Sequence, residues 1–155
     1  MTYGSQIWGQ GIKTYTDKIQ TIQNTALRII SFADFNAEIN QLYNNHKILK
    51  IHDQITLQNC LFIHDYLNNK LPTSFNNTFC KVNQIHEIPT RNSTMGSLFI
   101  PHINTTKYGL NSIYRKSIEA WNYFIKENKN INIGDVSRTK LKTIIIDHFV
   151  QLYEN

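Results

Sequence analysis

The chain has few of the residues that mark specialised protein classes: two cysteines, three prolines and six glycines among its 155 residues. Cys60 and Cys80 are too few for a disulfide framework, so we expect a reducing compartment. The longest aliphatic run, 144–146, is far shorter than the roughly 20 apolar residues that cross a bilayer. The first ten residues, MTYGSQIWGQ, lack the apolar core of a signal peptide. These absences predict an intracellular protein, cytoplasmic or nuclear, without a membrane partner.

Charged residues are also scarce, at 17%, and hydrophobic residues make up 41%. Uncharged polar residues, asparagine above all, fill many positions that charged residues usually occupy on protein surfaces. A length of 155 residues is that of one domain and is enough to bury a core. We therefore expect residues 1–155 to form a single helical domain, with residues 1–15 poorly ordered.

The sequence lacks the arrangements of residues that carry common catalytic chemistry. Its eleven acidic residues are scattered, and no Asp-Asp pair stands on a strand-turn-strand pattern that would hold Mg²⁺ for nucleotidyl transfer. There is no P-loop, no nucleophile elbow and no HExxH helix. We therefore expect no enzymatic activity from the chain by itself, and no cofactor.

Positive charge is concentrated in the last third of the chain. The formal net charge is +5, and the window 107–142 accounts for all of it. Such an excess indicates a surface that meets a polyanion. The alternative is a pair of solvated helix faces that bind no nucleic acid. The basic residues of the window are Lys107, Arg115, Lys116, Lys126, Lys129, Arg138, Lys140 and Lys142.

Apolar residues recur mostly with helical spacing. The segment 53–67 carries so broad an apolar face that we expect a central helix packed on two sides. Segment 68–108 breaks the rhythm with three prolines and many Asn, Ser and Thr residues, which indicates loops and at most one short helix after Pro72. The expected fold is all-α, an irregular bundle of five or six helices with a loop-rich insertion at 68–108. The main helices are predicted at 17–32, 37–45, 53–67, 110–125 and 141–152.

Three of the predicted helices carry residues with specific expected roles in the core or at a helix start. In the helix at 17–32, the isoleucines are predicted to face the core, and Thr16 or Asp17 could cap its start. Ser137 is a candidate cap for the last helix. Trp121 is predicted to be a core anchor rather than a platform for base stacking, because it shares a face with other apolar residues.

Six short signatures follow one another in a fixed order: SQIWGQ at 5–10, IQNTALRII at 22–30, then ILKI, KLPTSF, HEIPTR and SIYRKSIEAWN. Together they resemble the thumb and post-polymerase segment of reverse transcriptases from LINE-type, jockey-like non-LTR retrotransposons. The resemblance covers nearly the whole chain. In that family the catalytic carboxylates lie upstream of this segment, so the resemblance implies a parent RNA-directed DNA polymerase and a non-catalytic piece of it.

The resemblance implies two kinds of partner. One is template RNA or an RNA/DNA hybrid, held through its backbone without sequence preference. The other is the upstream polymerase domains of the parent protein. The residues that we expect to contact nucleic acid are Arg28, Arg91, Lys107, Arg115, Lys116, Arg138, Lys140 and Lys142.

Several of these residues have alternative interpretations. Arg28 falls off the apolar line of its helix, where its guanidinium could bind a phosphate through two hydrogen bonds or pair within the chain. His86, Thr90 and Arg91 match a spacing that recurs in the family, and they could grip a phosphate or tie their loop to the bundle. After Trp121 and Asn122 the family commonly has Leu-Pro. This chain has Tyr123 and Phe124 there, which predicts that the helix runs on.

Other functions remain open at this stage. Cys60, His64, Cys80 and His86 could form a Cys2His2 zinc site, although a buried cysteine is more often a small hydrophobic side chain. The chain could instead be a helical interaction module whose apolar faces bind the missing polymerase domains or another copy of itself. It could also be an inactive transposon remnant.

Overall fold

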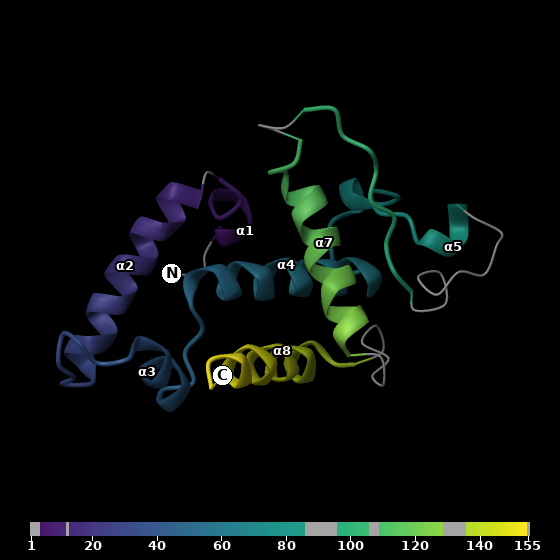
Figure 1. Cartoon of the computed structure of the whole chain (residues 1–155). Coiled ribbons are helices and arrows are strands. Elements are labelled where there is room, and N and C mark those ends of the chain that lie inside the picture. The colour runs from purple at the N-terminus through teal and green to yellow at the C-terminus, as the bar shows by residue number, and fades with distance from the viewer. Residues whose placement is uncertain (1–3, 12, 86–95, 106–108, 129–135, 155) are drawn as a thin grey trace. The chain divides into compact units, whose positions relative to one another are not determined.

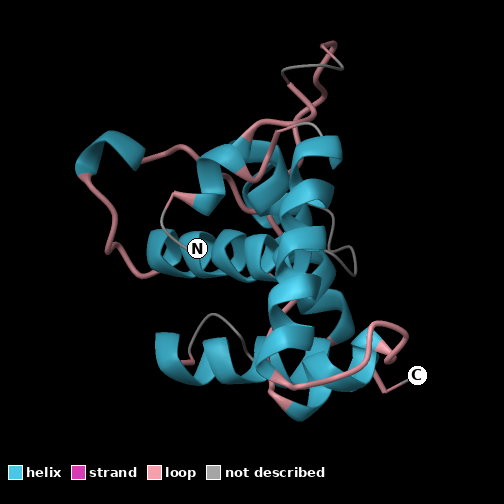
Figure 2. Cartoon of the chain, turned by 90° about the vertical axis from the view of Figure 1, so that its left-hand side faces the viewer, coloured by secondary structure: helices cyan, strands magenta, loops and turns pink. Residues whose placement is uncertain are grey.

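The computed structural model describes residues 4–11, 13–85, 96–105, 109–128 and 136–154. The described part of the chain is mainly helical and contains no strand (Figure 2), apart from an isolated antiparallel bridge between Lys81 and Leu98. The expected all-α fold is confirmed. The elements labelled in Figure 1, together with the 3₁₀ helix η1, are α1 (Ser5–Trp8), α2 (Lys13–Ile30), α3 (Ile39–Asn45), α4 (Ile51–Leu67), η1 (Thr73–Phe75), α5 (Val82–Ile85), α7 (Ile113–Glu127) and α8 (Arg138–Leu152).

Five of these described helices, α2, α3, α4, α7 and α8, are longer than one turn and correspond to the five predicted segments. α2 begins at Lys13, so Thr16 and Asp17 lie inside the helix and the predicted cap is wrong. The Thr16 hydroxyl donates instead to the Lys13 carbonyl, one turn back. The Ser137 cap is confirmed, because the Lys140 amide donates to its hydroxyl at 3.3 Å. None of the described helices is long and apolar enough to span a bilayer.

The chain divides into two compact units, one formed by 1–57 with 142–155 and the other by 58–141. Both division points fall inside helices, α4 and α8. The expectation of a single domain stays a prediction. No residue of α4 is exposed, in agreement with the predicted burial of this helix on more than one side.

The first unit, 1–57 with 142–155, is organised by polar side chains of α2 that hold the segment before α4. Gln23 Nε2 donates to the Leu49 carbonyl at 2.8 Å, and the Ile51 amide donates to Gln20 Oε1 at 2.8 Å. The buried Tyr43 of α3 donates its hydroxyl proton to Asn24 of α2 at 2.8 Å. The signatures IQNTALRII and ILKI are therefore neighbours in space, joined by hydrogen bonds to backbone groups that would otherwise be unpaired.

The end of the chain is fixed within the same unit. The buried Tyr153 donates its hydroxyl proton to the Asp53 carboxylate and accepts a hydrogen bond from the Lys50 amide at 3.1 Å. The Lys50 ammonium lies 4.5 Å from the centre of the Tyr153 ring. Asn44 donates to Glu154 at 2.9 Å. These contacts tie the residues that follow α8 to α3 and to the start of α4.

The second unit, 58–141, has an aromatic core. Trp121 is 1% exposed, which confirms it as a core anchor, and Phe124 beside it is also buried. The Phe79 ring stacks on Tyr114 at 5.0 Å between ring centres and meets Tyr66 edge-on at 4.8 Å. Such offset and edge-on pairs add stability beyond the area that they bury. They attach the loop-rich segment after Pro72 to α4 and α7.

One prediction about the core is wrong. Ile22, Ile29 and Ile30 of α2 were expected to be buried, but they are 61%, 69% and 64% exposed, and Leu27 is the apolar residue of this helix that is buried. The physical reason is that the apolar arc of α2 is broader than the surface that α3 and the segment before α4 present to it. One edge of the arc packs, and the other edge is left in solvent.

Candidate nucleic-acid interface

The start of α7 places two predicted contact residues at the positive end of a helix. Ser112 caps the helix, since its hydroxyl accepts a hydrogen bond from the Arg115 amide. Arg115 and Lys116 follow, and no acidic residue stands in the first turn. Both cations pair with one carboxylate, because Arg115 Nε lies 2.7 Å and Lys116 Nζ 3.4 Å from Glu119. One positive charge therefore remains uncompensated within this group.

The start of α8 repeats the arrangement. Ser137 caps the helix, and Arg138, Lys140 and Lys142 follow without an acidic residue in the first turn. Arg138 Nε lies 3.0 Å from Asp65 and is therefore partly neutralised. Lys140 and Lys142 are exposed, and no ion pair involves either of them within the described ranges. These two lysines are the described site residues best placed to meet a phosphate backbone.

Such positions cost the helix stability. The first turn of a helix carries a partial positive charge, so a cation there is unfavourable by about 0.3–1 kcal/mol, whereas an anion is stabilised. The partial positive charge of the helix start and the added lysines together create a positive potential that attracts phosphate. Helix stability therefore does not account for a lysine at position 140, in the first turn of α8.

Arg28 lies apart from these residues in sequence and belongs to the first unit. It stands in the last turn of α2, where its guanidinium carbon lies 5.7 Å from the centre of the Phe35 ring. Its Nε is buried and makes no hydrogen bond. A cation over an aromatic face is attracted by the ring. This contact favours the intramolecular interpretation of Arg28 over a contact with nucleic acid.

The remaining candidates are not among the described residues. Arg91 and Lys107 lie outside the described ranges, as do His86 and Thr90. Their roles stay predictions. The structure thus describes three predicted groups, at the start of α7, at the start of α8 and at the end of α2.

The carboxyl end of α7 adds residues that sequence reasoning did not assign to the site. The helix runs past Trp121 and Asn122 to Glu127, as the absence of Leu-Pro predicted. Tyr123 is 48% exposed, and with Lys126 it lines an open hollow of ≈ 510 Å³ beside Leu98 and Ile100. Proteins that bind single-stranded nucleic acid commonly combine aromatic rings, on which bases stack, with basic side chains that hold the backbone. The departure from the family pattern at position 123 was the available signal.

Two of the four candidates for a zinc site, Cys60 and His64, are buried in the described structure, and His86 lies outside the described residues. Cys60 is fully buried, and burial raises the pKa of its thiol to about 12, so it is not a ready thiolate ligand. His64 is 1% exposed and its Nε2 lies 2.7 Å from the Val136 carbonyl, so this ring holds the segment before α8. Cys80 is exposed. No group of three potential metal ligands occurs within the described part of the chain.

No family model, no curated protein and no solved structure matches this chain.

Proposed function

We propose that this chain is a non-catalytic helical segment of a retrotransposon-type RNA-directed DNA polymerase, and that it binds the backbone of template RNA or of an RNA/DNA hybrid. The observation that carries the proposal is the exposure of Lys140 and Lys142 in the first turns of α8 without a carboxylate partner among the described residues. The order of the six signatures supports the parentage.

The mechanism is electrostatic. Phosphate contacts from lysines and from the amides at the starts of α7 and α8 would hold a duplex without reading its bases. A duplex of A-like form is recognised mostly by its shape and backbone. Each contact releases counterions, so the affinity must fall as salt rises. The upstream domains of the parent protein would supply the catalytic carboxylates.

The test is fluorescence anisotropy with a labelled RNA/DNA hybrid and with single-stranded RNA, from about 50 mM to about 300 mM salt. We expect the logarithm of the association constant to fall linearly with the logarithm of salt, with a slope of several units. The double variant Lys140→Glu/Lys142→Glu should bind at least tenfold more weakly than wild type at the lowest salt. No binding of the wild-type chain at low salt contradicts the proposal.

A matched control separates a local contact from the loss of net charge. Lys13→Glu/Lys18→Glu changes the net charge by the same amount on exposed positions of a different helix, α2. We expect this control to lose much less affinity. If both double variants lose affinity equally, binding depends on overall charge alone and the assignment to α8 is wrong.

A second candidate function, a helical interaction module, is favoured by a different observation. Large exposed apolar side chains occur in the first unit on α1, on α2 and in the turn after α2, among them Trp8, Phe32 and Phe35. Phe32 and Phe35 are 97% and 86% exposed. Large apolar side chains that are exposed in this way are typical of surfaces that contact another protein. The two functions use different residues and do not exclude each other.

A further inference from the structure

The open hollow at the carboxyl end of α7, which we call the α7 hollow, lies between this helix and the segment 97–100. Its volume of ≈ 510 Å³ falls within the range of about 300–1,000 Å³ that is typical of clefts for small ligands. Val82, Leu98 and Ile100 supply its apolar lining, and Tyr123 and Lys126 line it from α7. The α7 hollow therefore brings together apolar side chains, an aromatic ring and a cation.

Hydrogen bonds hold the walls of the α7 hollow in place. Two backbone hydrogen bonds, of 3.0 Å and 2.9 Å, join residues 80–82 to residues 97–99. Asn122 of α7 binds the backbone of Leu98 with its side-chain amide. The segment that lines the hollow is thus fixed both to residues 80–82 and to α7. Because these walls are already ordered, a ligand that enters the hollow has little chain entropy to offset.

The ring of Tyr123 indicates a planar ligand. The next two residues of α7, Phe124 and Ile125, are buried, whereas Tyr123 is 48% exposed. An exposed ring lacks part of the stabilisation that a buried aromatic side chain gains. A planar ligand that stacks on the ring beside the apolar lining would supply that contact. Nucleobases are planar, and they stack on aromatic side chains whatever their identity.

The charge of Lys126 indicates that the ligand is an anion. This lysine is exposed, and no ion pair joins it to another described residue. No acidic residue is among the described residues that line the α7 hollow. Lys126 also stands in the last turn of α7, where a cation complements the helix dipole. That role accounts for the lysine alone, and it does not account for an exposed ring and apolar side chains beside it.

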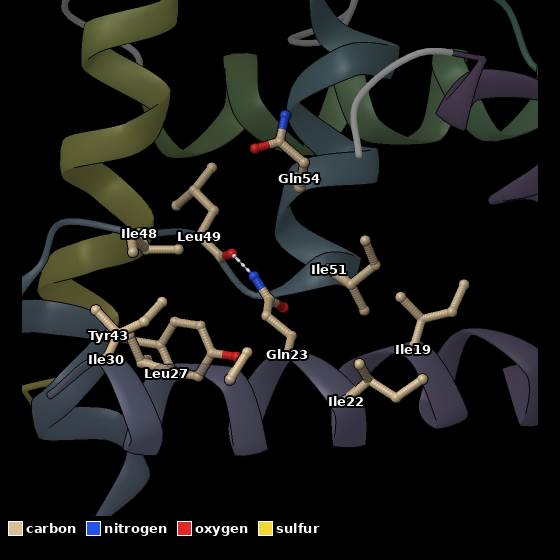
Figure 3. A pocket seen from close by; sticks show the side chains of 11 residues that line it. Ile19, Ile22, Gln23, Leu27, Ile30, Tyr43, Ile48, Leu49, Ile51 and Gln54 are labelled. Atoms are coloured by element: carbon tan, nitrogen blue, oxygen red, sulfur yellow. Dashed lines mark hydrogen bonds between the residues drawn. The ribbon is translucent and has the colours of Figure 1, made fainter. Parts of the chain in front are cut away.

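The hollow along α2 shows what an apolar lining lacks without a cation (Figure 3). It has a volume of ≈ 350 Å³, and isoleucines of α2 such as Ile19 and Ile22 line it. Its described lining residues carry no charge. The Gln23 amide in it is engaged by the Leu49 carbonyl. A phosphate in this hollow would meet no cation, so the combination with Lys126 distinguishes the α7 hollow.

We propose that the α7 hollow binds one unpaired nucleotide of the RNA strand, with the base stacked on Tyr123 and a phosphate at Lys126. This inference rests on the proposed function, because it takes RNA as the partner. It adds a site for a single-stranded nucleotide to the backbone contacts at the helix starts. Stacking does not depend on which base is present, so the site has no sequence preference. A hybrid with a single-stranded RNA overhang uses both kinds of contact.

The first experiment compares a blunt RNA/DNA hybrid with the same hybrid carrying an RNA overhang of about eight nucleotides. We expect the wild-type chain to bind the overhang substrate at least about fivefold more tightly, by fluorescence anisotropy. Tyr123→Ala should lose this gain, and Tyr123→Phe, which keeps the ring, should retain it. The control is Tyr15→Ala, because Tyr15 of α2 is also an exposed ring with a lysine 5.9 Å from its centre. Equal loss of the gain in Tyr15→Ala overturns the assignment to the α7 hollow.

Two further arms separate the base from its phosphate. An overhang of abasic nucleotides keeps the phosphates and lacks the bases, so most of the gain should disappear with it. Lys126→Ala should lower the salt slope for the overhang substrate by roughly 0.7 unit, which is the contribution of one single-strand phosphate contact. A wild-type chain that binds the blunt hybrid and gains nothing from the overhang overturns this inference and leaves the proposed function standing. Absence of binding to both substrates at low salt overturns both.

Discussion

Asn122 holds both backbone polar groups of Leu98. Its Nδ2 donates to the Leu98 carbonyl at 2.7 Å, and the Leu98 amide donates to its Oδ1 at 2.8 Å. Leu98 is 1% exposed, so water does not replace these bonds when they are lost. The family-like pair Trp121 and Asn122 thus has two structural tasks: the indole fills the core, and the amide fixes the segment that carries Leu98.

The first prediction concerns this clamp. Asn122→Ala should lower the free energy of unfolding by about 2–3 kcal/mol, because it leaves a buried amide and a buried carbonyl unpaired. Urea denaturation followed by tryptophan fluorescence measures the change, since Trp121 lies next to the altered residue. Asn83→Ala, at an exposed position of α5, should change stability by less than about 0.5 kcal/mol. Equal losses in the two variants would contradict the role assigned to the clamp.

A second prediction concerns Asp53 and Tyr153. Burial raises the pKa of the Asp53 carboxyl above its ordinary 3.8, and the hydrogen bond from Tyr153 opposes this shift. The folded chain therefore keeps the Asp53 proton to higher pH than the unfolded chain. Between the pKa of Asp53 in the unfolded chain and its higher pKa in the folded chain, folding takes up a proton. The contribution of Asp53 to stability therefore falls as pH rises from about 3.8 through the raised pKa. The difference in unfolding free energy between wild type and Asp53→Asn should fall across this window.

Removal of the partner sharpens this test. Tyr153→Phe deletes the hydroxyl that donates to Asp53 and accepts from the Lys50 amide. We expect a loss of about 2–3 kcal/mol at neutral pH and a further rise in the pKa of Asp53, read from the NMR shift of its carboxyl carbon. Tyr123→Phe, at an exposed ring in the other unit, is the matched control. An unchanged Asp53 titration in Tyr153→Phe would contradict the assigned hydrogen bond.

The positions of the helices were predictable from the sequence. Which side of each helix is buried was less predictable. Periodicity located α2, α4, α7 and α8, since each carries apolar residues at helical spacing. The same pattern does not reveal how wide the neighbouring surface is, which is why Ile22 and Ile29 were expected in the core and lie in solvent. The cap at Ser137 was predictable because a serine just before a helix commonly accepts a hydrogen bond from a backbone amide of the first turn.

The ion pairs of the basic residues were also only partly predictable from the sequence. The Arg115–Glu119 pair has i,i+4 spacing within one helix and is the kind of pair that a sequence reveals. The Arg138–Asp65 pair joins residues far apart in the chain, and it depends on the tertiary structure. A count of charge in the window 107–142 therefore overstated the number of free cations.

A third prediction separates the two cysteines. Burial raises the pKa of the Cys60 thiol to about 12, whereas Cys80 is exposed. Ellman's reagent at neutral pH should therefore modify one thiol per folded chain quickly and the second after addition of denaturant, because the thiolate is the reactive form. The Cys80→Ser chain should show no fast phase. Fast reaction of both thiols in the native protein would mean that Cys60 is accessible.

The last prediction uses Glu119, whose carboxylate binds both Arg115 and Lys116. Glu119→Gln releases these cations while it keeps the shape of the side chain. If the start of α7 contacts nucleic acid, affinity for an RNA/DNA hybrid should rise roughly two- to fivefold at about 50 mM salt, and the salt slope should steepen. Stability should change by less than about 1 kcal/mol, because ion pairs that solvent still reaches contribute little.

The matched control is Glu127→Gln in the last turn of the same helix. It gives the same change in net charge, and Glu127 forms no ion pair with another described residue. A larger gain of affinity in Glu119→Gln than in Glu127→Gln would assign the contact to the first turn of α7, because only there are two cations released. Equal gains would show that the hybrid senses overall charge, and the start of α7 would then not be part of the proposed interface.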